Sequence, residues 1–270
     1  MDLKNLHWLS ASEAARLIRE GAISSKQMVE ACLARVREAD GQIQAWAFLD
    51  PDHALAQARA ADELRLSGRP VGPLHGVPVG VKDIFDTADM PTENGSVLHA
   101  GRTPSRDATV VAMLRGAGAV IMGKTVTTEY AFLAPGKTRN PYNPDHTPGG
   151  SSSGSAAAVA AGMVPLAIGS QTNGSTIRPA AFCGVLGFKP THGLIPRHGI
   201  LTLSRTLDHV GLFARTIEDI ALLAEQLAGY DERDPDTRPR AHPVRPSGGG
   251  GAAATPHVRV REDAVLGARR

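Results

Sequence analysis

The sequence predicts an α/β fold, with layers of helices around a mixed, largely parallel sheet. Helical and strand-like segments alternate along the chain up to about Tyr230. Between residues 76 and 125, a strand pattern, a helix pattern and a second strand pattern follow one another directly. The chain has 270 residues, of which 42% are hydrophobic and 21% charged, which is enough for a buried core. Because strands that alternate with helices usually pair in parallel, this order indicates α/β layers.

Three helices are expected in the N-terminal part. Each of the first two follows a Ser that has a Glu or Gln three residues later, the spacing of a capping box. The third helical pattern stops at a Gly and a Pro, which both end helices. The expected helices cover residues 14–21, 28–39 and 53–68, and the two capping boxes are Ser10 with Glu13 and Ser24 with Gln27.

The following part alternates strands with helices. Short apolar or alternating runs predict the strands, and apolar residues at helical spacing predict the helices. Thr216 is a suitable N-cap for the last helix. The expected strands cover residues 76–85, 120–125 and 164–170, and the expected helices cover residues 107–119, 155–162 and 216–229.

The chain changes character near residue 231. From Thr237 onward it has seven Arg against two acidic residues, several prolines, a run of four glycines and no aromatic residue. Such a composition buries too little apolar surface to offset the entropy of ordering. We therefore expect a folded core over residues 1–231 and a disordered Arg/Pro/Gly-rich tail over residues 232–270.

Composition and charge exclude several classes of function. No apolar run approaches the roughly 20 residues of a membrane span, and the N-terminus has no secretory signal, so we expect a cytoplasmic protein without a membrane partner. Without the Arg-rich tail the chain is slightly acidic, which argues against a nucleic-acid partner. No His or Cys spacing is typical of a metal site, so no metal and no cofactor is expected. Cys32 and Cys183 are expected to be buried thiols.

Three loops carry side chains that suit catalysis, and each also has an ordinary interpretation. Lys82 ends an apolar strand, where its ammonium either reaches water or is held partly desolvated with a lowered pKa. Residues 149–155 lead into an Ala-rich helix and form either a plain N-cap or a set of outward-pointing amide groups. Asn173 and Gly174 tolerate left-handed backbone, which makes either an ordinary turn or an oxyanion hole beside Ser175.

Together the three loops resemble the amidase signature family. Ser151 stands 69 residues after Lys82, and Ser175 stands 24 residues after Ser151. The resemblance covers roughly residues 8–230 and is densest over residues 148–193. It implies an amidase-signature α/β/α fold that hydrolyses amides without a cofactor. Because family members are typically much longer, it also implies a sheet that is incomplete at the C-terminal side.

The resemblance implies a role for each residue. Ser175 matches the nucleophile, Ser151 the serine whose peptide bond is cis, and Lys82 the general base. A serine hydroxyl needs a base to take its proton as it attacks an amide, so Ser151 would pass the proton from Ser175 to a neutral Lys82. The oxyanion hole would consist of the backbone amides of Thr172, Asn173, Gly174 and Ser175.

Arg178 has two interpretations. In relatives that act on carboxylated amides, an arginine at this position binds the substrate carboxylate. Alternatively, Arg178 fixes the loop through a structural ion pair.

A different hydrolase motif overlaps the second loop. Residues 150–154 satisfy GxSxG, which would make Ser152 the nucleophile of a Ser-His-Asp enzyme. That motif must follow a strand, whereas the Pro-rich residues 140–148 precede this one, so we reject this interpretation.

The function expected from the resemblance is hydrolysis of the carbon–nitrogen bond of a small carboxamide through a seryl acyl-enzyme. Two alternatives stay open: an inactive, truncated remnant of an amidase, and an A-type component of a glutamine amidotransferase. The expected partner is a small-molecule amide, and a homo-oligomer is left open.

Overall fold

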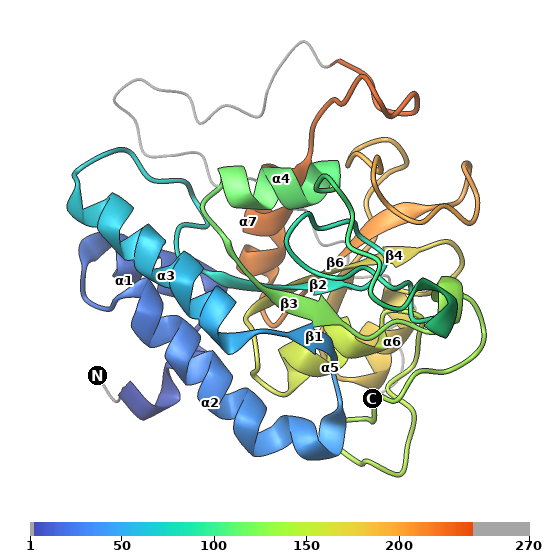
Figure 1. Cartoon of the computed structure of the whole chain (residues 1–270), viewed down its shortest axis with the longest axis horizontal. Helices are drawn as coiled ribbons and strands as arrows, with labels where there is room; N and C mark the ends of the chain where they lie inside the picture. Colours follow the sequence, from blue (N-terminus) through green and yellow to red (C-terminus); the bar gives the residue numbers. More distant parts are fainter. Residues whose placement is uncertain (1–2, 240–270) are drawn as a thin grey trace, which may run out of the picture. The chain divides into compact units, whose positions relative to one another are not determined.

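The computed structural model describes residues 3–239, and within them six strands form one mixed sheet in the order β1-β3-β2-β4-β6-β5 (Figure 1). The strands are β1 (Trp46–Leu49), β2 (Pro78–Lys82), β3 (Val120–Thr125), β4 (Leu166–Gln171), β5 (Leu186–Phe188) and β6 (His209–Ala214).

The parallel part of the sheet is smaller than expected. Only the central strands β3, β2 and β4 run parallel, whereas β1, β6 and β5 each pair antiparallel with their neighbours. The parallel strands follow one another through helical crossovers, the connection that parallel pairing requires. The chain returns from β4 to β6 through loops at one edge, which makes that pair antiparallel. The mixed α/β fold is thus confirmed, with parallel pairing confined to its centre.

Seven α-helices occur in the described part of the chain. At α2, Ser24 accepts the N–H of Gln27 and the Gln27 side chain accepts the N–H of Ser24, so this capping box is complete. At α1 only Ser10 contributes a capping bond, from the N–H of Glu13. The helices are α1 (Ala11–Glu20), α2 (Ser25–Ile43), α3 (Pro51–Leu66), α4 (Thr109–Gly116), α5 (Ser153–Ala160), α6 (Ile177–Phe182) and α7 (Ile217–Leu227).

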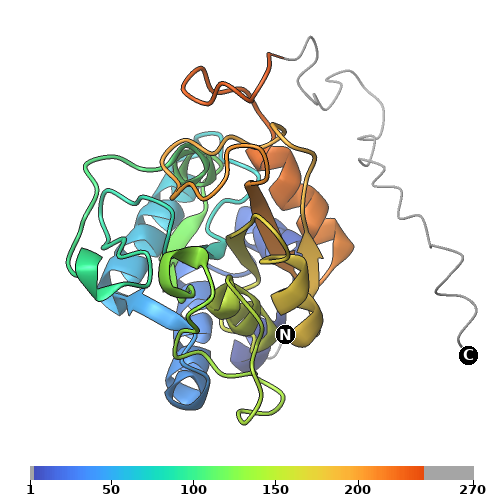
Figure 2. The ribbon, with the colours of Figure 1, turned by 90° about the vertical axis from the view of Figure 1, so that its right-hand side faces the viewer.

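Helices cover both faces of the sheet. α4 and α7 lie on one side of the strands, and α5 and α6 lie on the other (Figures 1 and 2). The small residues of α5 allow it to pack very close to the sheet edge. A Cβ added at Gly154 would lie 2.3 Å from both Ala45 O and Val126 N. This close approach places the N-terminus of α5 against the central strands.

Two charged side chains join the N-terminal segment to α7. The carboxylate of Asp219 accepts the backbone N–H groups of Ala11 and Ser12 and the Ser12 hydroxyl. The guanidinium of Arg215 donates to four backbone carbonyls, which belong to His7, Leu9, Val159 and Val164.

The beginning of the expected tail packs on the body. Asp234 and Thr237 are buried, and Asp234 accepts hydrogen bonds from the backbone and the guanidinium of Arg197. For residues 232–239 the expectation of an unpacked tail therefore does not hold, because ion pairs rather than apolar burial hold them. Residues 240–270 lie outside the described residues.

Cys32 and Cys183 are buried free thiols, as expected, and burial raises the pKa of each to about 12. None of the described helices combines the length and the hydropathy that crossing a membrane would require.

Candidate active site

The candidate site lies at the carboxyl ends of β2 and β4. These strands are parallel neighbours, with Val81 opposite Ile168. The residues that follow them therefore meet at one edge of the sheet, where ligands of α/β proteins commonly bind. β2 ends in Lys82, and β4 continues into residues 172–175. Residues 149–152 reach the same edge because α5, which they precede, packs on both strands.

Lys82 is completely buried at this edge. Its Nζ lies 2.7 Å from Ser151 Oγ and 2.8 Å from Ser170 Oγ. Burial removes water from the ammonium and lowers the pKa of Lys82 well below its ordinary value of 10.5, and only the carboxylate of Asp208 acts appreciably in the opposite direction. Of the two interpretations of Lys82, the structure has the desolvated one. Burial thus favours the neutral amine.

Ser151 is held by its backbone as well as by Lys82. The Gly150–Ser151 peptide bond is cis. Ser151 O accepts the N–H of Thr128 at 3.2 Å. The preceding Gly149 has φ of 75°, and a Cβ there would lie 2.9 Å from the Cα of Pro179, so the loop needs glycine at this position.

Ser175 lies beside this loop, at the end of the segment that follows β4. Its carbonyl accepts the N–H of Ser152 at 3.3 Å, and its side chain is 7% exposed. Within residues 3–239, Ser175 Oγ forms no hydrogen bond to another protein group, Ser151 included. The structure thus joins Lys82 to Ser151 directly and brings Ser175 to the same loop through its backbone.

The amides proposed for the oxyanion hole are unoccupied by protein acceptors. No acceptor within residues 3–239 receives a hydrogen bond from the backbone N–H of Thr172, Asn173, Gly174 or Ser175. Backbone donors near a nucleophile that have no protein partner can bind a developing oxyanion.

The turn is made differently from what the sequence suggests. Neither Asn173 nor Gly174 has a positive φ, so left-handed backbone does not shape this loop. Instead, the Oε1 of Gln171 accepts the N–H groups of Thr176 and Ile177, each at 3.0 Å. The side chain of Gln171 therefore caps α6 and bends the chain back after Ser175.

Arg178 contacts the Gly150–Ser151 loop. Its Nε and Nη2 donate to Gly150 O at 2.9 and 2.7 Å, and its side chain is exposed. This contact supports the loop-fixing interpretation, although the partner is a carbonyl rather than an acid. Binding of a substrate carboxylate by Arg178 remains a prediction.

Ser152, the centre of the GxSxG match, is engaged elsewhere. It is completely buried, and its Oγ lies 3.2 Å from both Ser170 O and Ser170 N. Its hydroxyl thus joins the loop to β4 and is poorly placed to meet a substrate.

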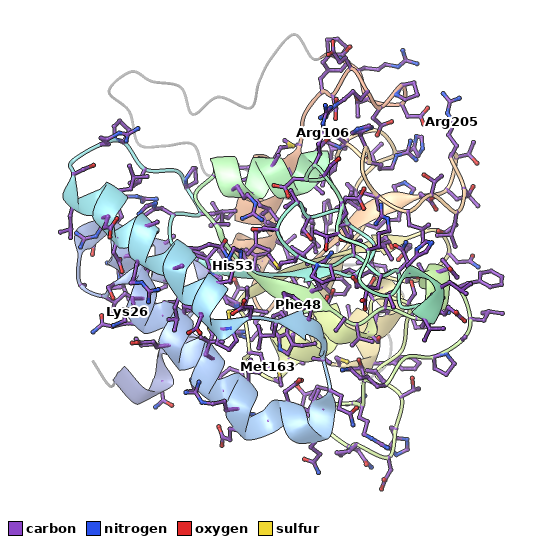
Figure 3. The ribbon with its side chains drawn as sticks, in the orientation of Figure 1. Lys26, Phe48, His53, Arg106, Met163 and Arg205 are labelled. Carbon is purple, nitrogen blue, oxygen red and sulfur yellow. The ribbon has the colours of Figure 1, made fainter. Side chains whose placement is uncertain are left out.

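A cavity of about 310 Å³ opens beside the site. Ser170, Thr172 and Asp208 line it together with two outer loops, residues 197–205 and 233–236. Figure 3 shows Arg205 in one of these loops, on the opposite side of the molecule from Lys26 in α2. The cavity adjoins Ser170, a partner of Lys82, so a small molecule in it would lie close to the buried lysine.

A second lysine is also buried near the site. Lys124 Nζ donates to Phe85 O at 2.8 Å and to Thr92 Oγ1 at 2.6 Å, and it lies 3.7 Å from a carboxylate oxygen of Asp83. Burial lowers its pKa to about 8, against the opposing effect of Asp83. Its hydrogen bonds hold the chain that follows Lys82.

Sequence reasoning missed Ser170, Gln171 and Asp208. Each acts through a tertiary contact with the three loops, and no local motif marks such a contact. No group of three His, Cys, Asp or Glu side chains in the described part of the chain could hold a metal ion.

Comparison with known proteins gives one family. The model of the family described as Amidase matches residues 27–253. The A-type component of glutamyl-tRNA(Gln) amidotransferase from Chloroflexus aurantiacus is 44% identical over 243 residues, which are 88% of this chain and 50% of that protein. The corresponding protein of Thermobifida fusca is 47% identical, over 84% of this chain and 47% of its own length.

Solved structures agree with these sequences. The peptide amidase of Stenotrophomonas maltophilia has a TM-score of 0.81 and 38% identity, over 85% of this chain and 50% of that one. A bacterial aryl acylamidase has a TM-score of 0.80 and 32% identity, over 86% of this chain and 50% of that one. The chain spans about half the length of the curated relatives it matches.

Proposed function

Since the chain belongs to the amidase signature family, we propose that it hydrolyses the carbon–nitrogen bond of a small carboxamide through an acyl-enzyme on Ser175. The observation that carries the proposal is the 2.7 Å contact between the buried Lys82 Nζ and Ser151 Oγ, beside Ser175. The cavity of about 310 Å³ lies at the lower end of the range for small-molecule sites.

The first step forms the acyl-enzyme. Ser175 Oγ attacks the amide carbon while its proton passes to Ser151 Oγ, and the Ser151 proton passes to the lone pair of Lys82 Nζ. The carbonyl oxygen becomes an oxyanion, which the free amides of residues 172–175 stabilise. When the carbon–nitrogen bond breaks, the proton returns through the same groups to the leaving nitrogen.

The second step reverses these transfers. Water replaces the amine and attacks the acyl carbon, while Lys82 takes its proton through Ser151. The carbon–oxygen bond to Ser175 then breaks, and Ser175 Oγ recovers its proton. The products are a carboxylic acid and ammonia or an amine, so no oxidant or reductant is needed.

Ser170 supports this relay. A neutral amine has two N–H groups and one lone pair, and Ser170 Oγ, 2.8 Å away, accepts one N–H. This contact helps to fix the amine so that its lone pair can face Ser151.

An ammonia-release assay of the purified 270-residue chain tests the proposal. The panel holds acetamide, benzamide, a C-terminally amidated dipeptide and glutamine. We expect release from at least one amide, and a loss of about 1,000-fold or more in kcat/KM in Ser175→Ala. Ser152→Ala is the matched control and should retain most of the activity. Turnover at the unaltered level in Ser175→Ala would contradict the assignment.

The names of the curated relatives favour a second candidate, a glutamine-hydrolysing component that supplies ammonia to partner proteins. Both candidates use the same acyl-enzyme and differ in the acyl donor. Affinity purification of the tagged chain from its own cells separates them. Co-purified proteins that raise glutamine hydrolysis would favour the amidotransferase component, and an unaccompanied chain that prefers another amide would favour the stand-alone amidase.

A further inference from the structure

Asp208 stands next to the site and has no part in the steps above. Its Oδ1 accepts the hydroxyl of Thr172 at 2.5 Å. Its Oδ2 accepts the backbone N–H groups of Leu203 and Ser204 at 2.8 and 2.9 Å. Both carboxylate oxygens are therefore engaged, one by the loop of the nucleophile and the other by the outer loop.

Strand pairing brings Asp208 and Thr172 together. In the antiparallel pair of β4 and β6, Gln171 lies opposite His209. The next residue of the β4 chain and the preceding residue of the β6 chain are Thr172 and Asp208, so the ladder continues into a side-chain contact. The hydroxyl of Thr172 belongs to the first residue of the proposed oxyanion hole.

Arg197 holds Asp208 from the other side. Its Nη1 donates to Asp208 O at 3.1 Å and to Arg205 O at 2.6 Å. The same guanidinium pairs with Asp234 and Asp236. The outer loop is thereby tied to the body, and the carboxylate of Asp208 has a fixed position.

We propose, on the basis of the function proposed above, that Asp208 is a positioning residue that fixes the oxyanion-hole loop through the Thr172 hydroxyl and whose negative charge acts on Lys82. It touches neither the reacting carbonyl nor Ser175, and it acts through Thr172 and through the electric field at the lysine.

The charges around both groups favour such a field. The other groups within reach of Lys82 Nζ are the uncharged hydroxyls of Ser151 and Ser170, and Asp83 is bound by backbone amides and by Lys124. The charged groups that surround Asp208 are Arg197, Arg205, His209, Asp234 and Asp236.

The charge of Asp208 opposes the effect of burial and raises the pKa of Lys82. If the carboxylate is replaced by an amide, the ammonium loses this stabilisation and the lysine releases its proton at lower pH. Because the base must be neutral, the rising limb of the pH–rate profile should move to lower pH in Asp208→Asn. A purely structural role would leave the limb in place.

The experiment measures the rate at which a fluorophosphonate probe labels Ser175 in the full chain, between pH 5 and pH 10. The readout needs no knowledge of the natural substrate. For Asp208→Asn we expect labelling slower by roughly 10- to 100-fold at the plateau, because the oxyanion-hole loop shifts, together with a rising limb at lower pH. Thr172→Val should slow labelling without moving the limb, and Thr172→Ser, which keeps the hydroxyl, should restore the rate.

Asp219→Asn is the matched control, because Asp219 also accepts two backbone N–H groups and one hydroxyl, but on α7. It should leave rate and limb unchanged. A limb that does not move in Asp208→Asn, or an equal loss in Asp219→Asn, would overturn the role of Asp208. If Asp208→Asn does not fold, equal rates for Thr172→Val and Thr172→Ser would overturn it. Absence of labelling at Ser175 in the unaltered protein would overturn the proposed function and this role with it.

Discussion

Lys82 combines complete burial with two hydroxyl partners, and these features affect stability and chemistry in opposite ways. In the folded protein its pKa lies below the ordinary 10.5, so the unfolded chain binds one proton more between the two pKa values. Through linkage, the stability of the folded state must rise with pH across that window. The neutral amine suits a general base, and its burial costs stability at lower pH.

Lys82→Met tests this conflict. The variant should label no faster than Ser175→Ala, because the base is gone. Its free energy of unfolding should rise less than that of the unaltered protein between pH 7 and pH 10, because a methionine releases no proton in that range. Urea unfolding at both pH values measures the difference. An equal rise in the two proteins would show that Lys82 is already charged when folded.

At the residue level, the sequence identifies those site residues that stand in a recognisable motif. The spacing of Lys82, Ser151 and Ser175 pointed to one site, and the structure places the first two in direct contact. Asp208 could not be found in this way, because its contact with Thr172 arises from the pairing of β4 with β6. No local pattern records which strands become neighbours.

Among the elements, α5 positions the Ser151 loop and tolerates no added bulk on its sheet-facing side. In Gly154→Ala, the new methyl would lie 2.3 Å from backbone atoms of Ala45 and Val126. We expect a loss of at least about 2 kcal/mol in the free energy of unfolding and slower labelling of Ser175.

Gly41→Ala in α2 is the matched helical control, because nothing lies within 4 Å of its added Cβ. It should stabilise the protein by roughly 0.5–1 kcal/mol. Chemical denaturation of both variants gives the comparison. Equal effects at the two glycines would show that α5 does not depend on its close approach to the strands.

The long amphipathic helices were predictable, and several short elements were not. Capping residues and apolar spacing locate α2 and α7, and the cap of each is present. β1, β5 and β6 have three to six residues, and two of them contain glycine, so their patterns are too short to stand out. The antiparallel part of the sheet consists of these strands, which explains why the sequence suggested more parallel pairing.

In the body as a whole, Arg215 joins segments that are far apart in the sequence. Its guanidinium donates to carbonyls of the N-terminal segment and of the chain on either side of the end of α5. Arg215→Met would leave these carbonyls unpaired, so we expect a loss of about 3 kcal/mol or more in the free energy of unfolding.

Arg16→Met is the control for Arg215, because Arg16 pairs with Glu20 on an exposed face of α1. It should cost less than about 0.5 kcal/mol. Thermal and urea unfolding of both variants check this prediction. A small effect of Arg215→Met would show that the N-terminal segment is held by apolar packing alone.

The activity of the whole protein is a separate question from the geometry of its site. The chain spans about half the length of the curated relatives it matches. An acyl pocket that is open to water would weaken the stabilisation of the oxyanion. The inactive-remnant hypothesis therefore predicts labelling at Ser175 without turnover, whereas the amidase proposal predicts both.

The most direct test of the central claim is to label the full chain with a fluorophosphonate probe and to map the modified peptide by mass spectrometry. The claim is that Ser175 is the nucleophile and that Lys82 activates it through Ser151. The account predicts one modified serine, Ser175, and loss of the label in Lys82→Met and Ser151→Ala. Labelling of a folded protein at Ser152 or another serine, or undiminished labelling of Ser175 without Lys82, would contradict it.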